Sequence, residues 1–324
     1  MIDYSVIIKN YPNISKVFTQ DWFEKEITKN KNEMHLLAKQ FTFTGQDGSS
    51  LDSSSLQYIN FLEKLLKDME VEINSQKDHF KRLLGTNKKG NYKENKKDYI
   101  STLAQIEIGS FFKKMGLNPE FEPSIQGKDG KGDIKINNDG VEVFIEVTIK
   151  EGPRTGDICI FSWDDIDNLS VNDKDSLVEI REINFTQPQI YGKKFDEKNR
   201  QLLKFSPNNP NIVALYLDTS SIPERENIIR GLGLDIAWEK NGNTVHIKEG
   251  EHKIYNKEEE HIIDNSMISA VLLYFRYFDN KHNIVKELCL NPKADNQLPD
   301  SLIAKFRDFD TKIIIPVSYK DQIL

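Results

Sequence analysis

The sequence predicts a protein of the α/β (α+β) class, in which a mixed β-sheet flanked by helices follows a helical N-terminal region. Within residues 55–85, apolar residues recur at the three- and four-residue spacing of one helix face. From residue 99 the pattern changes to helix, strand, strand, strand, helix, strand. We therefore expect a helical region over residues 1–98 and a sheet-containing domain with a C-terminal extension over residues 99–324.

The composition favours a soluble protein that needs no disulfide or zinc to fold. The chain has 324 residues, 44 Lys or Arg, 51 Asp or Glu and a formal net charge of -7. Its two cysteines, Cys159 and Cys289, lie far apart and lack metal-site spacing, which favours a reducing cytosol. No stretch approaches the roughly 18 apolar residues of a membrane span, and no signal peptide is recognised. We expect a cytoplasmic protein with no membrane partner, and the net charge excludes one that coats nucleic acid over its whole surface.

A basic segment closes the N-terminal region. Residues 77–97 contain eight Lys or Arg against two acidic residues. This pattern is typical of a solvated helix end and linker, and a surface that follows a phosphate backbone is the alternative. In the second case Lys88, Lys89 and Lys93 would contact nucleic acid.

The sheet-containing domain can be divided into elements in chain order. A helix begins at about residue 99 and ends at Gly116, which suits the C′ position. The tetrapeptide 137–140, Asn-Asn-Asp-Gly, predicts a tight hairpin. An acidic insertion is expected over residues 163–182, and the type of element over 266–278 is left open between strand and helix. The remaining predictions are strands at 120–125, 133–137, 141–149 and 211–218, and helices at 195–205 and near 300–309.

Two carboxylates are expected to meet at the hairpin. Side chains alternate along a strand, so Glu146 lies on the face of strand 141–149 opposite to its valine and isoleucine residues. Asp133 begins the neighbouring antiparallel strand and comes within reach of Glu146. Two such charges need a shared proton or a cation between them. The alternative is that Glu146 is an ordinary outward-facing polar residue.

A third acid is predicted in the preceding helix. At 100° per residue, Glu107 falls near the middle of an apolar arc. A carboxylate aimed at a core needs a partner, either a metal or a basic side chain. Oxygen ligands from Asp133, Glu146 and Glu107 would suit Mg²⁺ or Mn²⁺. A cation so held can assist phosphodiester hydrolysis.

These residues resemble the motif of the PD-(D/E)XK nuclease superfamily, which has restriction-endonuclease-like structure. The match consists of Glu107, Asp133 in "GDIKI" and Glu146 in "FIEVTI", and it covers residues 99–218. The resemblance implies a mixed four-stranded sheet flanked by helices, with a divalent cation at Asp133 and Glu146. It also implies cleavage of nucleic acid, with DNA favoured, in defence or restriction.

The chain departs from that motif at Thr148, where the family carries a lysine that stabilises transition-state charge. In variants of the superfamily a residue of the following helix replaces it, which here offers Lys198 and Gln201. Lys198 is the preferred substitute, although a solvent-exposed helix lysine is the simpler interpretation. Lys150, two residues beyond Thr148, is a weaker candidate.

Two further hypotheses follow from the same residues. Because of Thr148 and the acidic balance, the domain can instead be a catalytically inactive module that binds nucleic acid or a partner protein. Alternatively, the helical N-terminal region is the interaction part and the sheet is a scaffold. In the nuclease hypothesis, Lys128 and Lys131 of the glycine-rich turn would contact a backbone phosphate. Formation of a homo-oligomer is left open.

Overall fold

The computed structural model divides the chain into two compact units, Met1–Glu122 and Pro123–Leu324. It describes residues 4–30, 33–42, 53–85, 92–123, 132–150, 195, 197–204, 206–217, 232, 235–238, 245–248, 255–256, 261–262, 265–276 and 284–314. The boundary lies later than the predicted break after residue 98, because helix α8 (Tyr92–Lys114) begins within the basic segment and is continuous across that point.

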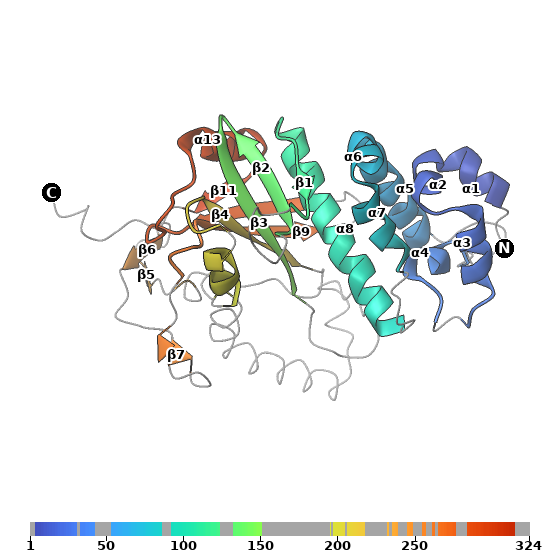
Figure 1. Ribbon diagram of the computed structural model, residues 1–324, viewed down its shortest axis with the longest axis horizontal. Coiled ribbons are helices and arrows are strands. Elements are labelled where there is room, and N and C mark those ends of the chain that lie inside the picture. The colour runs from blue at the N-terminus through green and yellow to red at the C-terminus, as the bar shows by residue number, and fades with distance from the viewer. Residues whose placement is uncertain are drawn as a thin grey trace. The chain divides into compact units, whose positions relative to one another are not determined.

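The first unit is helical, as the sequence predicts (Figure 1). Its longest helices are α5 and α8, and these two are in contact. Within α5 the predicted apolar face is buried from Ile59 to Leu66, whereas Leu56 at its start is 40% exposed. Its elements are α1 (Tyr4–Asn10), α2 (Pro12–Val17), α3 (Gln20–Ile27), α4 (Leu36–Gln40), α5 (Ser53–Asp68), α6 (Glu70–Ser75), α7 (Lys77–Lys81), η1 (Arg82–Leu84), α8 (Tyr92–Lys114) and β1 (Glu120–Phe121).

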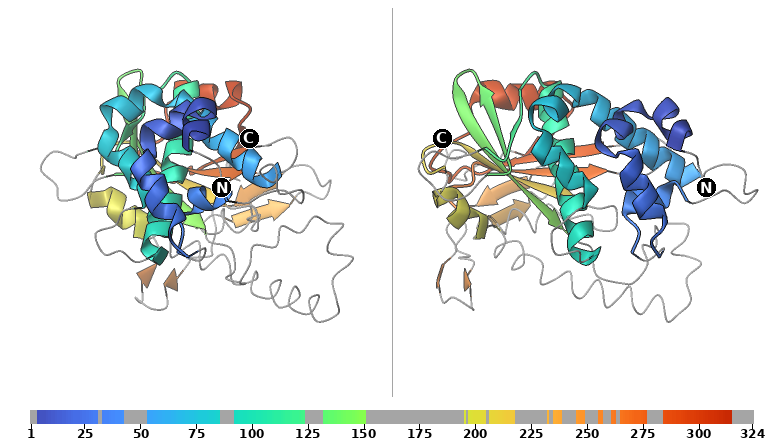
Figure 2. Two further views of the ribbon diagram at one scale, coloured as in Figure 1. Left: turned by 90° about the vertical axis from the view of Figure 1, so that its right-hand side faces the viewer. Right: turned by 45° about the vertical axis from the view of Figure 1, so that its right-hand side comes forward.

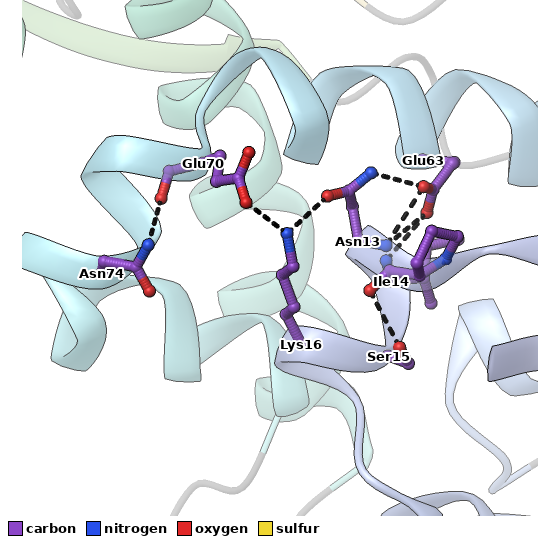
Figure 3. Close-up of polar contacts among 8 residues, drawn as sticks. Asn13, Ile14, Ser15, Lys16, Glu63, Glu70 and Asn74 are labelled. Carbon is purple, nitrogen blue, oxygen red and sulfur yellow. Dashed lines mark hydrogen bonds and ion pairs between the residues drawn. The ribbon is translucent and has the colours of Figure 1, made fainter.

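A carboxylate from one helix caps the start of another in this unit. The N-cap residue of α2, Tyr11, makes no side-chain capping hydrogen bond. Instead, Glu63 of α5 accepts hydrogen bonds from the backbone N–H groups of Asn13 and Ile14 (Figure 3). Lys16 then joins Asn13 to Glu70 through its ammonium group. Glu63 therefore satisfies backbone donors that α2 cannot satisfy within itself.

Helix α8 ends where the sequence predicts. Gly116 has a φ of 78°, the left-handed conformation that glycine adopts at C′. Its N–H donates to the Lys113 carbonyl, and the N–H of Leu117 donates to the Phe112 carbonyl. These two bonds form a Schellman motif.

The second unit is built on a mixed sheet. Its strands lie side by side in the order β2, β3, β4, β9, β10, β11, which is a larger sheet than the four strands implied by the family resemblance. Strands β3, β4 and β9 run parallel, and β2 and β10 are antiparallel to their neighbours β3 and β9. Two small hairpins accompany the sheet, β5–β6 and β7–β8. The strands are β2 (Ile134–Asn138), β3 (Val141–Lys150), β4 (Asn211–Leu217), β5 (Asp235–Trp238), β6 (Val245–Lys248), β7 (Tyr255–Asn256), β8 (His261–Ile262), β9 (Ala270–Arg276), β10 (Ile284–Leu290) and β11 (Lys312–Ile314).

The predicted hairpin joins β2 to β3 through Asp139 and Gly140. Both residues have positive φ, 55° and 87°, as a type I′ turn requires. Asn137 supports the turn by accepting a hydrogen bond from the N–H of Gly140. At the same end of the hairpin, Asn138 donates to Ser301 of α13 (Asp300–Asp308), which lies beside it (Figure 2).

One face of the sheet carries the main core of this unit. Val213, Leu215, Val271 and Leu273 are buried there against Phe195 and Leu202, which belong to helical residues 195 and 197–204. Cys289 is a free cysteine in the same cluster, and burial, with a smaller effect of Glu287, raises the pKa of its thiol to about 12. The segment 266–278, left open by sequence, contains strand β9. The predicted acidic insertion at 163–182 lies outside the described residues.

His35 of the first unit caps a helix and has a lowered pKa. Its ring contacts those of Trp22 and Tyr99, with centroid distances of 4.9 Å and 4.4 Å. Its Nδ1 accepts a hydrogen bond from the N–H of Leu37 and so caps α4. Burial lowers the pKa of His35 from 6.5 to about 3. The folded chain therefore holds a neutral imidazole down to about pH 3.

The lowered pKa of His35 predicts that the folded protein loses stability in acid. The unfolded chain takes up a proton between pH 6.5 and 3 that the folded chain does not. The contribution to the free energy of unfolding should be complete above pH 6.5 and fall by about 1.4 kcal/mol per pH unit below it. Urea unfolding followed by circular dichroism at pH 5.0 to 7.5 measures this. His35→Asn keeps a capping side chain without the titration, and equal pH slopes in both proteins would contradict the account.

Candidate active site

Asp133 is held against strand β3 by a backbone hydrogen bond. Strand β2 begins at Ile134, which pairs with Ile145, so Asp133 and Glu146 are the next residues along the antiparallel register. The Asp133 carboxylate accepts a hydrogen bond of 2.7 Å from the N–H of Val147. It thereby satisfies a donor of β3 that lies beyond the end of the β2 ladder. Because directly opposed residues share a face, Asp133 and Glu146 lie on one side of the sheet.

Glu146 is a buried acid with a cationic partner. The residue is 5% exposed, and its Oε2 lies 2.9 Å from the Nζ of Lys198. Its other oxygen, Oε1, extends towards Gly132, where an added Cβ would lie 3.7 Å away. The Glu146 carboxylate therefore lies beside the chain that leads into Asp133.

Lys198 reaches Glu146 from a helix that is anchored on both sides of it. Phe195 and Leu202, three residues before and four after, are buried in the core cluster. The neighbouring Asn199 accepts a hydrogen bond of 2.9 Å from the N–H of Met267, just before β9. These contacts put Lys198 on the inward side of the helix, with its side chain 21% exposed.

Thr148 follows two residues after Glu146 on the same face of β3. Its Oγ1 is buried and has no hydrogen-bond partner among the described residues. An unsatisfied buried hydroxyl costs free energy, and such a group in a native structure often marks the place of a water, ion or ligand. The hydroxyl carries no charge, whereas Lys198 places a cation beside Glu146.

The other predicted site residues are exposed, belong to the first unit, or lie outside the described residues. Gln201, offered with Lys198 as a substitute, is exposed. Glu107 lies in α8 of the first unit and is 2% exposed. Lys93 is helical in α8, and its side chain lies outside the described residues, as does that of Lys150. Lys88, Lys89, Lys128 and Lys131 lie outside them altogether.

The burial of Glu107 is not distinctive within α8. Its place in an apolar arc would be exceptional if only one face of α8 were buried. In the structure the middle of α8 is buried through consecutive residues, and Thr102, Gln105 and Ser110 are also 3% exposed or less. The burial of Glu107 is therefore shared by polar neighbours that have no predicted role.

The described residues do not bring together the three acids of the predicted metal site. Within the part of the chain that the structure describes, no three His, Cys, Asp or Glu side chains gather closely enough to hold a metal ion. Asp133 and Glu146 remain as a pair, with the unsatisfied Thr148 hydroxyl on the same face. Mg²⁺ is commonly held by one or two carboxylates and keeps several waters. The donor set thus fits Mg²⁺ or Mn²⁺ with water completing the shell.

Sequence reasoning missed two residues next to the site. Gly132 lies beside the Glu146 carboxylate, and Asn199 fixes the helix that carries Lys198. No motif points to Gly132, because the sequence predicts only a flexible glycine-rich turn there. The second could not be found without knowing that the segment before β9 packs on this helix.

Comparison of the chain with protein-family models, with curated proteins and with solved structures found no match. The resemblance to the nuclease superfamily therefore depends on the motif residues and the order of elements. Among the described helices, none combines the length and apolar character that a membrane crossing needs.

The Lys198–Glu146 ion pair predicts that substitutions of its two residues have non-additive effects on the free energy of unfolding. Lys198→Met leaves the buried Glu146 carboxylate without its partner and should lower the free energy of unfolding by about 2 kcal/mol. The double variant Glu146→Gln, Lys198→Met removes both charges and should recover most of that loss. Urea unfolding of the two single variants, the double variant and the unchanged chain gives the interaction energy. Additive effects would show that the two groups do not depend on each other.

Proposed function

We propose that the chain is a nuclease that depends on Mg²⁺ or Mn²⁺ and belongs to the PD-(D/E)XK superfamily, with DNA as the favoured substrate and a role in defence or restriction. The observation that supports this most is the placement of Lys198. The motif position is Thr148, and a lysine from the following helix lies 2.9 Å from the motif glutamate. One cation thus accompanies the two acids, as the motif requires.

Each residue has a separate task in this proposal. Asp133 and Glu146 hold the divalent cation, which polarises the phosphodiester and lowers the pKa of a bound water. Asp133 is kept in place by the Val147 N–H and Glu146 by its strand. Lys198 donates its ammonium hydrogens to the phosphate oxygens and offsets the charge that develops in the transition state. The Thr148 hydroxyl can orient a water but cannot supply that charge.

A second candidate function is a nuclease-like module without activity, which binds nucleic acid or a partner protein. The same ion pair favours it, because Lys198 already neutralises Glu146 and no metal is needed to keep the acid buried. The net charge of -7 favours the form of this module that binds a partner protein, since it opposes general binding of nucleic acid.

A cleavage assay separates the two functions. Purified protein is incubated with plasmid, linear DNA and RNA in Mg²⁺, in Mn²⁺ and with chelator. Cleavage of DNA that needs the metal and stops with chelator is the expected result. Binding without cleavage under every condition favours the inactive module.

The two acids should be essential for cleavage. Asp133→Asn and Glu146→Gln each remove one carboxylate charge and should lower the cleavage rate at least about a hundredfold, since even outer-shell changes at metal sites cost 10- to 100-fold. Glu142→Gln is the matched control, because Glu142 lies on the same face of β3 but is exposed and paired with Lys135. Cleavage by the Glu142 variant should stay at the level of the unchanged protein. Full activity of the Asp133 variant would refute the site.

A further inference from the structure

Glu146 already has a positively charged partner where the proposed metal would bind. The ammonium of Lys198 lies 2.9 Å from Oε2, and the Glu146 side chain is only 6% exposed. We propose that Lys198 is the resident counter-ion of this site, so that a divalent cation binds Glu146 only by displacing the lysine. This inference rests on the proposed function, because it assumes that Asp133 and Glu146 are the metal ligands.

Competition between the lysine and a metal follows from charge. A buried carboxylate needs a cation, and the Lys198 ammonium meets that need before any metal arrives. A dication at the same carboxylate would stand within a few ångströms of the ammonium, where like charges repel strongly at reduced dielectric. Metal binding must therefore break the ion pair, and the free energy of the pair is subtracted from the affinity for metal.

The structure allows the lysine to leave without moving its helix. Asn199, Phe195 and Leu202 fix the backbone on either side, so the displacement is confined to the flexible four-carbon side chain. Its 21% exposure, against 6% for Glu146, shows that the lysine lies on the solvent side of the pair. A displaced ammonium is therefore directed to the side from which a phosphate backbone approaches. The same group serves first as counter-ion and then as a phosphate ligand.

The hairpin offers a matched ion pair that should not compete. Lys135 of β2 lies 3.3 Å from Glu142 of β3, with side chains 24% and 47% exposed. It pairs the same two charges at another glutamate of β3, one that is not a proposed ligand. Removing Lys135 changes the net charge as much as removing Lys198 does, so it separates displacement from a general electrostatic effect.

Calorimetric titration of the full chain with Mn²⁺ tests the inference. Lys198→Met should bind Mn²⁺ at least about tenfold more tightly than the unchanged protein, since a charge-assisted hydrogen bond contributes about that factor. Lys198→Arg keeps the charge, and Lys135→Met removes a charge elsewhere; both should stay within about threefold of the unchanged protein. The Lys198→Met variant should bind metal more tightly and yet cleave more slowly, an outcome that a merely structural lysine would not give.

The possible outcomes separate this inference from the proposed function. Equal or weaker Mn²⁺ binding by Lys198→Met, with clear binding by the unchanged protein, overturns the counter-ion role and leaves the metal site standing. Absence of Mn²⁺ binding by every protein overturns the proposed function and this inference with it. If Lys198→Met does not fold without metal, Lys198→Gln retains a donor without the charge and should show the same gain. Added Mn²⁺ should also raise the melting temperature of either variant more than that of the unchanged protein.

Discussion

The need of a buried carboxylate for a cation organises the second unit. Glu146 lies within a strand that is buried on both faces, and an unpaired charge there would cost several kcal/mol. The cation comes from Lys198 at 2.9 Å, on a helix whose position is fixed by its apolar neighbours and by Asn199. The Glu146–Lys198 ion pair therefore joins β3 to a helix that other contacts already hold in place.

Asp133 shows how one carboxylate can serve structure and chemistry together. By accepting the N–H of Val147, it extends the pairing of β2 and β3 by one residue beyond the ladder. That bond also holds its carboxylate on the same face as Glu146, which is the geometry that a divalent cation needs. A purely structural role would be complete with the hydrogen bond alone. The Thr148 hydroxyl on that face has no hydrogen-bond partner among the described residues, a property it shares with several other buried side-chain atoms.

Local signals in the sequence were reliable where one residue determines the geometry. Gly116 ends α8, and the Asp139–Gly140 turn sets the register that brings Asp133 opposite Glu146. The type of segment 266–278 could not be predicted, because an apolar run fits a buried strand and a buried helix equally. The contact of Lys198 with Glu146 depends on tertiary packing; the sequence offered Lys198 as the preferred residue and Gln201 beside it, and Gln201 is exposed. Helical periodicity did not distinguish Glu107, because the middle of α8 is buried along consecutive residues.

The central claim is that Asp133 and Glu146 form a divalent-cation site that Lys198 occupies in the absence of metal. Anomalous diffraction from crystals soaked in Mn²⁺ tests it most directly, because the ion and the lysine are located in one experiment. The account predicts an anomalous peak bonded to oxygens of Asp133 and Glu146, with Lys198 moved away from Oε2. Saturating Mn²⁺ with no peak there, and with Lys198 still paired to Glu146, would contradict it.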